Sequence, residues 1–212
     1  MPVTAKICGL STAATLDTAV AAGASHVGFV FFPPSPRHVT FDRAGALAMR
    51  VPAQTGKVGV FVDPQDALLD QAIRAARLDA IQLHRVTPER AAAIGARTRL
   101  PVWAAVAVKT RADLDAANGF RGAVQRIIYD AKVPEDAKLP GGMGMRFDWT
   151  LLQGFAHPLP WALSGGLDPA NVAEAVGITG ARLVDVSSGV ESAPGVKDDA
   201  KIAAFLKTVA TL

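Results

Sequence analysis

Short apolar runs alternate with segments of helical periodicity along the whole chain, and this alternation constrains the fold more than any other feature. The apolar run at residues 26–32 is unbroken, which is typical of a parallel strand buried on both faces. Strand and helix pairs recur at a spacing of roughly 20 to 30 residues, which predicts a (β/α)8 barrel, or TIM barrel, of the α/β class. Strands are expected at residues 4–8, 26–32, 57–62, 80–84, 102–108, 123–130, 161–164 and 182–186, and helices at 12–22, 42–50, 65–77, 88–97, 111–118, 147–154, 169–176 and 198–209.

The length of the chain fits one well-cored domain, so residues 1–212 are expected to form a single barrel. A doubly wound open sheet is the rival architecture. That fold normally carries a Gly-rich phosphate turn after its first strand, and Cys8-Gly9-Leu10-Ser11 does not match the GxGxxG pattern. The sequence therefore favours the closed barrel.

The charges argue against a nucleic-acid surface. The formal net charge is +3, but the Lys and Arg residues are scattered and interleaved with Asp and Glu, as around Arg74, Arg77 and Asp79. Such a distribution is typical of solvated helix faces, whereas nucleic-acid binding requires a basic stripe or patch. A small anionic substrate is the expected partner, with no nucleic acid and no membrane.

The single cysteine and the first residues of the chain exclude several classes of protein. Cys8 is the one cysteine, so an intrachain disulfide and a CxxC metal or redox site are excluded. Strand character begins directly after Met1 and Pro2, without the basic and apolar regions of a signal peptide, and no apolar run approaches the roughly 20 residues of a membrane span. A cytoplasmic protein is expected.

Two glycine-rich junctions near the end of the chain predict a phosphate site. Strand character stops at Gly165 and Gly166 after residues 161–164, and again at residues 187–189 after the last strand. Glycine amides, a helix N-terminus and serine hydroxyls can all donate to a phosphate, and the last two junctions of (β/α)8 barrels often hold one. The expected phosphate-binding residues are Gly165, Gly166, Ser187, Ser188 and Gly189.

Polar residues at the carboxyl ends of barrel strands converge on one mouth, which makes them candidates for chemistry. Cys8 ends the first strand beside a glycine; it is either an inert core thiol or, with Lys6 or Arg37 nearby, a thiolate base or nucleophile. Asp130 either caps its loop or pairs with Lys132 or Lys138, or it is a sheltered carboxyl with a raised pKa, as a general acid requires. The candidates are Cys8, Arg37, Asp63, His84, Asp130 and residues 185–188.

Three further side chains have two interpretations each. Arg37 follows Ser35 and Pro36, and a guanidinium held by prolines suits a planar carboxylate, although an exposed charge on a loop is the alternative. His84 is either a core or strand-end histidine bonded to backbone, or a side chain that contacts the substrate or orients a loop. Ionised Asp185 would repel phosphate oxygens, so we expect it to orient a loop or bind a substrate hydroxyl.

The long loop at residues 131–146 is expected to be a lid or binding loop.

These residues together resemble the phosphoribosylanthranilate isomerase family, and the match covers essentially the whole chain in order. The matching segments are Lys6-Ile7-Cys8-Gly9, Gly28-Phe29-Val30-Phe31, Ser35-Pro36-Arg37, Val58-Gly59-Val60-Phe61, Gln82-Leu83-His84, Asp130, Gly141-Gly142-Met143-Gly144, Phe147-Asp148-Trp149, Ser164-Gly165-Gly166-Leu167, Asn171-Val172, Asp185-Val186-Ser187-Ser188-Gly189-Val190-Glu191 and Pro194-Gly195-Val196-Lys197-Asp198.

The resemblance implies a cofactor-free and metal-free Amadori rearrangement of N-(5-phosphoribosyl)anthranilate to 1-(2-carboxyphenylamino)-1-deoxyribulose 5-phosphate, in tryptophan biosynthesis. By analogy with the family, Asp130 is the general acid that protonates the furanose ring oxygen, and Cys8 is the general base that removes the C2 proton. Arg37 holds the anthranilate carboxylate, and the two glycine-rich loops hold the phosphate of the phosphosugar substrate. A monomer or a homodimer is expected.

The sequence departs from the family pattern at three positions. Arg85 follows Gln82-Leu83-His84 where glycine is usual, Met143 replaces a polar residue beside the acid, and Ala104 replaces a lysine often found after strand five. These changes bear on turnover and substrate breadth more than on reaction type.

Three alternatives remain open at this point. A metal-dependent ribulose-phosphate 3-epimerase would need His and Asp ligands on neighbouring strands, and His84 is the one histidine expected at the mouth. A ProFAR-type isomerase would use an aspartate base where this chain has Cys8. A non-catalytic phosphate-ligand sensor on the same barrel is the alternative from another class.

Overall fold

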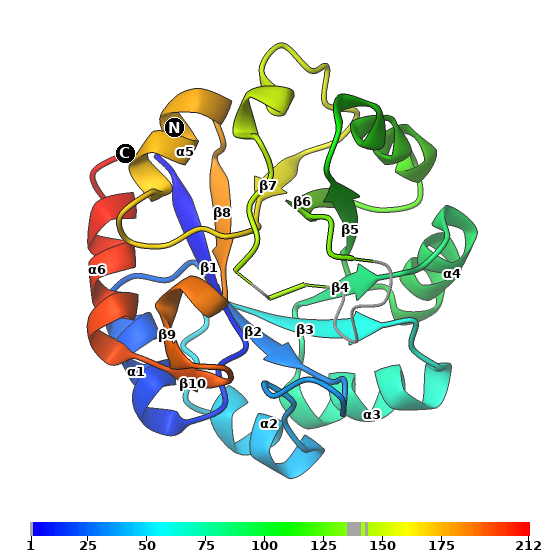
Figure 1. The fold of residues 1–212 in the computed structure, drawn as a ribbon. Helices are drawn as coiled ribbons and strands as arrows, with labels where there is room; N and C mark the ends of the chain where they lie inside the picture. The colour runs from blue at the N-terminus through cyan, green and yellow to red at the C-terminus, as the bar shows by residue number, and fades with distance from the viewer. Residues whose placement is uncertain (1, 135–140, 143) are drawn as a thin grey trace.

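The computed structural model describes residues 2–134, 141–142 and 144–212. Within them, parallel strands β1 to β8 close into a barrel in sequence order, with β1 hydrogen-bonded to both β2 and β8. Figure 1 shows these strands at the centre and the helices around them, with both chain ends beside α5 and α6. The closed barrel confirms the predicted fold class. The strands are β1 Thr4–Cys8, β2 His26–Val30, β3 Gly56–Val62, β4 Ala80–His84, β5 Val102–Val108, β6 Arg126–Ala131, β7 Trp161–Leu163 and β8 Leu183–Val186.

Helices α1, α2, α4 and α6 begin where a side chain accepts a hydrogen bond from a free backbone N–H group. Thr12, Thr40 and Thr87 each accept a hydrogen bond from the backbone three residues later, and Pro88 occupies the first position of α4. The described α-helices are α1 Ala13–Ala21, α2 Phe41–Ala48, α3 Asp66–Ala76, α4 Pro88–Thr98, α5 Val172–Thr179 and α6 Asp199–Val209, and the 3-10 helices are η1 Arg111–Phe120, η2 Trp149–Leu152 and η3 Ser188–Val190. None of the helices in the described residues is long and apolar enough to cross a membrane.

Some predicted bounds are wrong for local reasons. Helix α3 begins at Asp66, one residue later than predicted, because Asp63 turns the chain after β3 with a φ of 40° and Gln65 is the N-cap. Helix α5 begins three residues later than predicted, since Asp168 accepts hydrogen bonds from the amides of Ala170 and Asn171 and so holds a turn there. The predicted helix at residues 111–118 is the 3-10 helix η1, which runs two residues further, and the predicted helix at 147–154 contains the shorter 3-10 helix η2.

The sequence reading did not anticipate a small hairpin between β8 and α6. Strands β9 Glu191–Ala193 and β10 Val196–Lys197 pair antiparallel, outside the barrel sheet. The hairpin follows η3 directly and lies against the mouth, near β1 and β2 (Figure 1). It brings Glu191 and Lys197 into the functional region.

Side chains point alternately inward and outward along each barrel strand. The outward residues pack under the helices in the large core, whereas the inward residues at the N-terminal ends form what we call the inner apolar layer. Each member of this layer lies two residues before an inward residue nearer the mouth, as Ile128 does before Asp130. The inner apolar layer consists of Val58, Ala80, Trp103, Ile128, Ala162 and Leu183.

Candidate active site

A cavity opens at the carboxyl ends of the barrel strands, as expected for this fold. It encloses about 810 Å³ of empty space, part of it open to solvent. Two predicted residues do not line it: Asp63, and Gly189, which packs so closely on the carbonyl of Leu167 that no side chain would fit there. The predicted site residues that do line it are Cys8, Arg37, His84, Asp130, Gly165, Gly166, Asp185, Ser187 and Ser188.

Asp130 projects from β6 into this cavity. Its Oδ1 accepts a hydrogen bond from the amide of Ala131 at 2.9 Å. Burial raises the pKa of Asp130 to about 7, and the negative charge of Asp185 adds to the effect. The structure thus agrees with the expectation of a sheltered carboxyl. The alternative pairing with Lys132 is not found, because Lys132 makes its ion pair with Asp113 at 3.3 Å; Lys138 lies outside the described residues.

Cys8 ends β1 and faces the same cavity, with 7% of its surface exposed. Burial raises the pKa of the Cys8 thiol above its ordinary value of 9.0, against the opposing effects of Lys6 and Lys197. Desolvation therefore outweighs the nearby positive charges in setting the pKa of the thiol, and the thiolate that these charges favour stays a prediction. Gly28 explains how the thiol fits, because a Cβ there would lie 3.1 Å from the sulfur and 3.2 Å from Cε of Lys6.

Lys6 and Asp185 form an ion pair inside the barrel, on the adjacent strands β1 and β8. Lys6 Nζ lies 2.8 Å from Asp185 Oδ1, and the two side chains are 0% and 5% exposed. Burial alone would lower the pKa of Lys6, but Asp185 and Cys8 raise it above 10.5, so the lysine is charged. The sequence reading missed this pair. Strand closure was the available signal, because β1 and β8 must be neighbours in a closed barrel.

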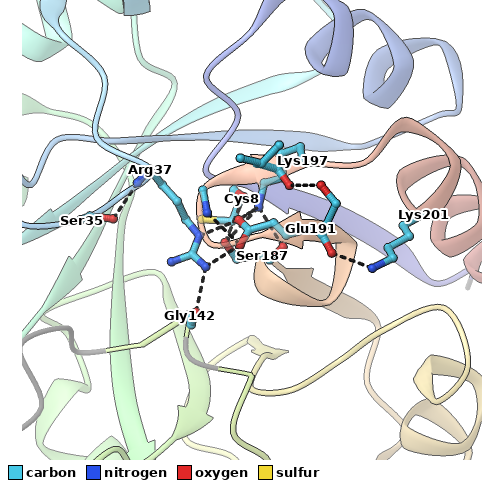
Figure 2. Close-up of polar contacts among 11 residues, drawn as sticks. Cys8, Ser35, Arg37, Gly142, Ser187, Glu191, Lys197 and Lys201 are labelled. Carbon is cyan, nitrogen blue, oxygen red and sulfur yellow. Dashed lines mark hydrogen bonds and ion pairs between the residues drawn. The ribbon is translucent and has the colours of Figure 1, made fainter.

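The guanidinium of Arg37 is held by an acidic side chain and a backbone carbonyl. Its Nε and Nη2 donate to the two carboxylate oxygens of Glu191 at 2.7 and 2.8 Å, and Nη2 also donates to the carbonyl of Gly142 at 2.8 Å (Figure 2). The residue is only 5% exposed, which rules out the alternative of a charge on an exposed loop. Glu191 lies in one of the segments that match the family, but the sequence pattern alone assigns it no role.

His84 ends β4, and its ring bonds to the side chain of Gln82. Its Nε2 lies 3.1 Å from Nε2 of Gln82, and burial lowers the pKa of His84 to about 4, so the ring is neutral. Gln82 lines the cavity too, and its Oε1 is buried without a hydrogen-bond partner among the described residues. A neutral amide and imidazole pair therefore forms part of the cavity wall.

The loops after β7 and β8 adopt the backbone conformations that the glycines predicted. Gly165 and Gly166 have φ values of 86° and 66°, and the carbonyl of Gly166 accepts a hydrogen bond from Asn171 Nδ2 at 3.0 Å. Ser187 donates to the carbonyl of Cys8 at 3.2 Å. The loops are thus tied to α5 and to β1 at the rim of the cavity.

The three departures from the family pattern have different positions. Ala104 lies inside β5, fully buried in the core under the helices, so it is not at the mouth and cannot affect the site directly. Arg85 follows β4 with a φ of 56° and lines a side pocket that continues from the cavity past Asp130. Met143 lies outside the described residues. In the described part of the chain, no His, Cys, Asp and Glu side chains are grouped to hold a metal ion.

Comparison with known proteins gives a consistent picture. Residues 5–208 match the family model described as N-(5'-phosphoribosyl)anthranilate (PRA) isomerase. The chain is 54% identical to an N-(5'-phosphoribosyl)anthranilate isomerase of Paramagnetospirillum magneticum, over 98% of this chain and 97% of the relative. It is also 54% identical to that of Zymomonas mobilis subsp. pomaceae, with both chains fully covered.

Solved structures that are similar to this chain include members of the same family. The phosphoribosyl anthranilate isomerase of Thermotoga maritima superposes with a TM-score of 0.89 at 35% identity, covering 99% of this chain and all of that one. A phosphoribosyl anthranilate isomerase in complex with reduced 1-(o-carboxyphenylamino)-1-deoxyribulose 5-phosphate gives a TM-score of 0.86 at 32% identity, with the same coverage.

Proposed function

The chain belongs to the phosphoribosylanthranilate isomerase family, and from this premise we propose that Asp130 and Cys8 are its general acid and general base. The enzyme catalyses the Amadori rearrangement of N-(5-phosphoribosyl)anthranilate to 1-(2-carboxyphenylamino)-1-deoxyribulose 5-phosphate, in tryptophan biosynthesis. The observation that carries the assignment is that both groups face one cavity from β1 and β6. These strands are separated by β7 and β8 on one side and by β2 to β5 on the other, so they can approach a sugar from different sides.

In the first step, protonated Asp130 gives its proton to the furanose ring oxygen. The bond between C1 and the ring oxygen breaks, and the anthranilate nitrogen shares its lone pair with C1 to form an iminium. A carboxyl with a pKa of about 7 is a suitable donor near neutral pH, because an appreciable fraction of it carries a proton there.

In the second step, the sulfur of Cys8 removes the proton from C2. The electrons of the C–H bond form a C1–C2 double bond and neutralise the iminium, which gives an enolamine that tautomerises to the ketone. The neighbouring Lys6 ammonium favours the thiolate that this step requires.

The active protonation state places a proton on Asp130 and none on Cys8. Because the pKa of Cys8 is raised above 9.0 and that of Asp130 is about 7, the single proton shared by the two groups resides mostly on sulfur. The working form, with the proton on Asp130, is then the less populated of the two singly protonated forms. Bound substrate that shelters the carboxyl further would increase the population of this form.

Substrate binding is proposed to anchor both ends of the molecule. Arg37 holds the anthranilate carboxylate, and Gly165, Gly166, Ser187, Ser188 and Gly189 hold the phosphate, with Gly189 acting by close packing of the loop. Anchoring far from C1 and C2 supplies the orientation that acid and base catalysis needs. Asp185 positions Lys6, and His84 lines the sugar side of the cavity.

The test separates binding from turnover. Cys8→Ala and Asp130→Asn are each expected to bind reduced 1-(o-carboxyphenylamino)-1-deoxyribulose 5-phosphate nearly as the wild type does, while losing turnover. Wild-type turnover in both variants would contradict the assignment. A chelator should leave activity unchanged, which distinguishes this chemistry from that of a metal-dependent epimerase.

We further propose that the protein acts in the cytoplasm as a single domain, either as a monomer or as a homodimer. A related structure contains monomers generated from the dimeric enzyme of Thermotoga maritima, so both states are compatible with this barrel. Light scattering of the purified protein would distinguish between them.

A further inference from the structure

Three buried charges lie together where the β9–β10 hairpin meets the cavity. Arg37, Glu191 and Lys197 are 5%, 7% and 8% exposed. Glu191 lies 2.7 Å from both cations, through Oε1 to Nε of Arg37 and to Nζ of Lys197. Figure 2 shows the single carboxylate between the two positive groups. One buried anion thus holds two cations from different parts of the chain.

The hydrogen bonds of the guanidinium define which of its donors remain available. Glu191 takes the edge formed by Nε and Nη2, and Gly142 takes a further N–H of Nη2. Nη1 has no hydrogen-bond partner among the described residues, and Arg37 lines the cavity. Because the guanidinium is planar, two bonds on one edge fix the orientation of the opposite donors. Glu191 therefore determines where Nη1 points.

Lys197 links the carboxylate of Glu191 to the loop after β8 and, through it, to the end of β1. Its Nζ donates to Glu191 and to the carbonyl of Ser187, at 2.7 and 2.8 Å, and it lies 3.2 Å from the Ser187 hydroxyl. That hydroxyl donates to the carbonyl of Cys8. A continuous set of contacts therefore joins the guanidinium of Arg37 to the loop of Ser187 and to the end of β1.

We propose that Glu191 is a positioning residue that directs the guanidinium of Arg37 toward the aromatic carboxylate of the substrate. Glu191 itself does not touch the substrate, since both of its carboxylate oxygens are engaged by Arg37 and Lys197. The inference rests on the proposed role of Arg37. A buried ion pair is weak evidence for a stabilising function, whereas here the pairing leaves an oriented donor at the wall of the substrate cavity.

The test compares two ligands in the variant Glu191→Gln. One is reduced 1-(o-carboxyphenylamino)-1-deoxyribulose 5-phosphate, and the other is the same compound without the ring carboxylate. We expect the Kd of the first to rise at least tenfold and that of the second less than threefold, because only the first uses Arg37. Equal losses for both ligands would indicate a merely structural role and overturn the proposal, as would unchanged binding of both.

A matched control and a conservative variant complete the test. Lys201 Nζ donates to the backbone carbonyl of Glu191 but does not touch its carboxylate, so Lys201→Met should bind both ligands as the wild type does. If Glu191→Gln does not fold, Glu191→Asp carries the same comparison. It keeps the charge but is one methylene too short to meet Nε and Nη2 of Arg37 while holding Lys197, and the same selective loss is expected.

Failure of this inference can be told apart from failure of the proposed function. If Arg37→Met weakens both ligands equally, the assignment of Arg37 to the carboxylate is wrong. If Arg37→Met weakens only the carboxylate ligand and the variants of Glu191 do not, the assignment of Arg37 stands and the positioning role of Glu191 is wrong.

Discussion

The two ends of the barrel interior bury different kinds of side chains, although the same strands supply both. On β6, Ile128 belongs to the inner apolar layer, while Asp130, two residues later, faces the cavity with a pKa raised to about 7. On β8, Leu183 and Asp185 repeat the same change. The members of the inner apolar layer stabilise the barrel without a charge of their own to desolvate, and this allows the other end to hold buried ions for chemistry.

The largest difference in turnover is expected between two substitutions on the same strand, β6. Asp130→Asn removes the proposed acid but keeps its shape, and we expect kcat to fall about 10³- to 10⁴-fold, toward the upper range for general acid catalysis. Ile128→Val should cost about 0.5 to 1.5 kcal/mol of unfolding free energy and change kcat less than twofold. Steady-state kinetics and thermal unfolding of both variants test the comparison, which fails if the two lose turnover equally.

Removing a lysine should destabilise the protein more at the mouth of the barrel than at its apolar end. Lys6→Met leaves Asp185 buried without its partner, which should cost about 3 to 5 kcal/mol of stability, and we expect kcat to fall about tenfold to a hundredfold. Since Lys6 lowers the pKa values of Cys8 and Asp130, both should rise in the variant.

The control for Lys6→Met is Lys57→Met at the other end. Lys57 pairs at 2.8 Å with Asp79, whose side chain is 51% exposed, so the loss should be no more than about 1 kcal/mol. Denaturant titration measures both variants. Similar losses would show that the two ends do not differ in how they hold charge.

The pH dependence of kcat tests the protonation state of the mouth. Below the pKa of Asp130, near 7, both groups are protonated and Cys8 cannot act as a base, so the rate should fall about tenfold per pH unit. Above the raised pKa of Cys8 both are ionised and no acid remains, so the rate should fall again. A plateau should separate the two limbs.

In Asp130→Asn the residual rate should rise with pH up to the pKa of Cys8, because only the base still titrates. An acid limb that remains near pH 7 in this variant would assign that limb to another group.

The smallest effect is expected from Arg126→Met at the apolar end. The Arg126 guanidinium lies over the ring of Trp103, with Cζ 5.2 Å from the ring centroid. Loss of this contact should cost about 0.5 to 1 kcal/mol and leave kcat and KM within twofold of the wild type. A larger change in kcat would mean that a change in packing at the inner apolar layer alters the geometry of the catalytic residues at the mouth.

Much of the fold and the site could be predicted because both depend on local patterns. The predicted bounds of residues 4–8, 80–84 and 102–108 agree with β1, β4 and β5, since apolar runs bounded by turns are local signals. Strand ends then place Cys8, His84 and Asp130 at one mouth. The hairpin β9–β10 was missed because its strands of three and two residues carry too little periodicity to detect.

The sequence by itself determined the barrel, the family and the identity of the side chains at its mouth, because strand alternation and short motifs are properties of neighbouring residues. Only the tertiary structure decided the partners of those side chains. Lys6 and Asp185 are separated by 179 positions and Arg37 and Glu191 by 154, yet each pair is in contact. Barrel closure and the hairpin bring them together, and burial then sets the pKa of Cys8 against the direction that its basic neighbours favour.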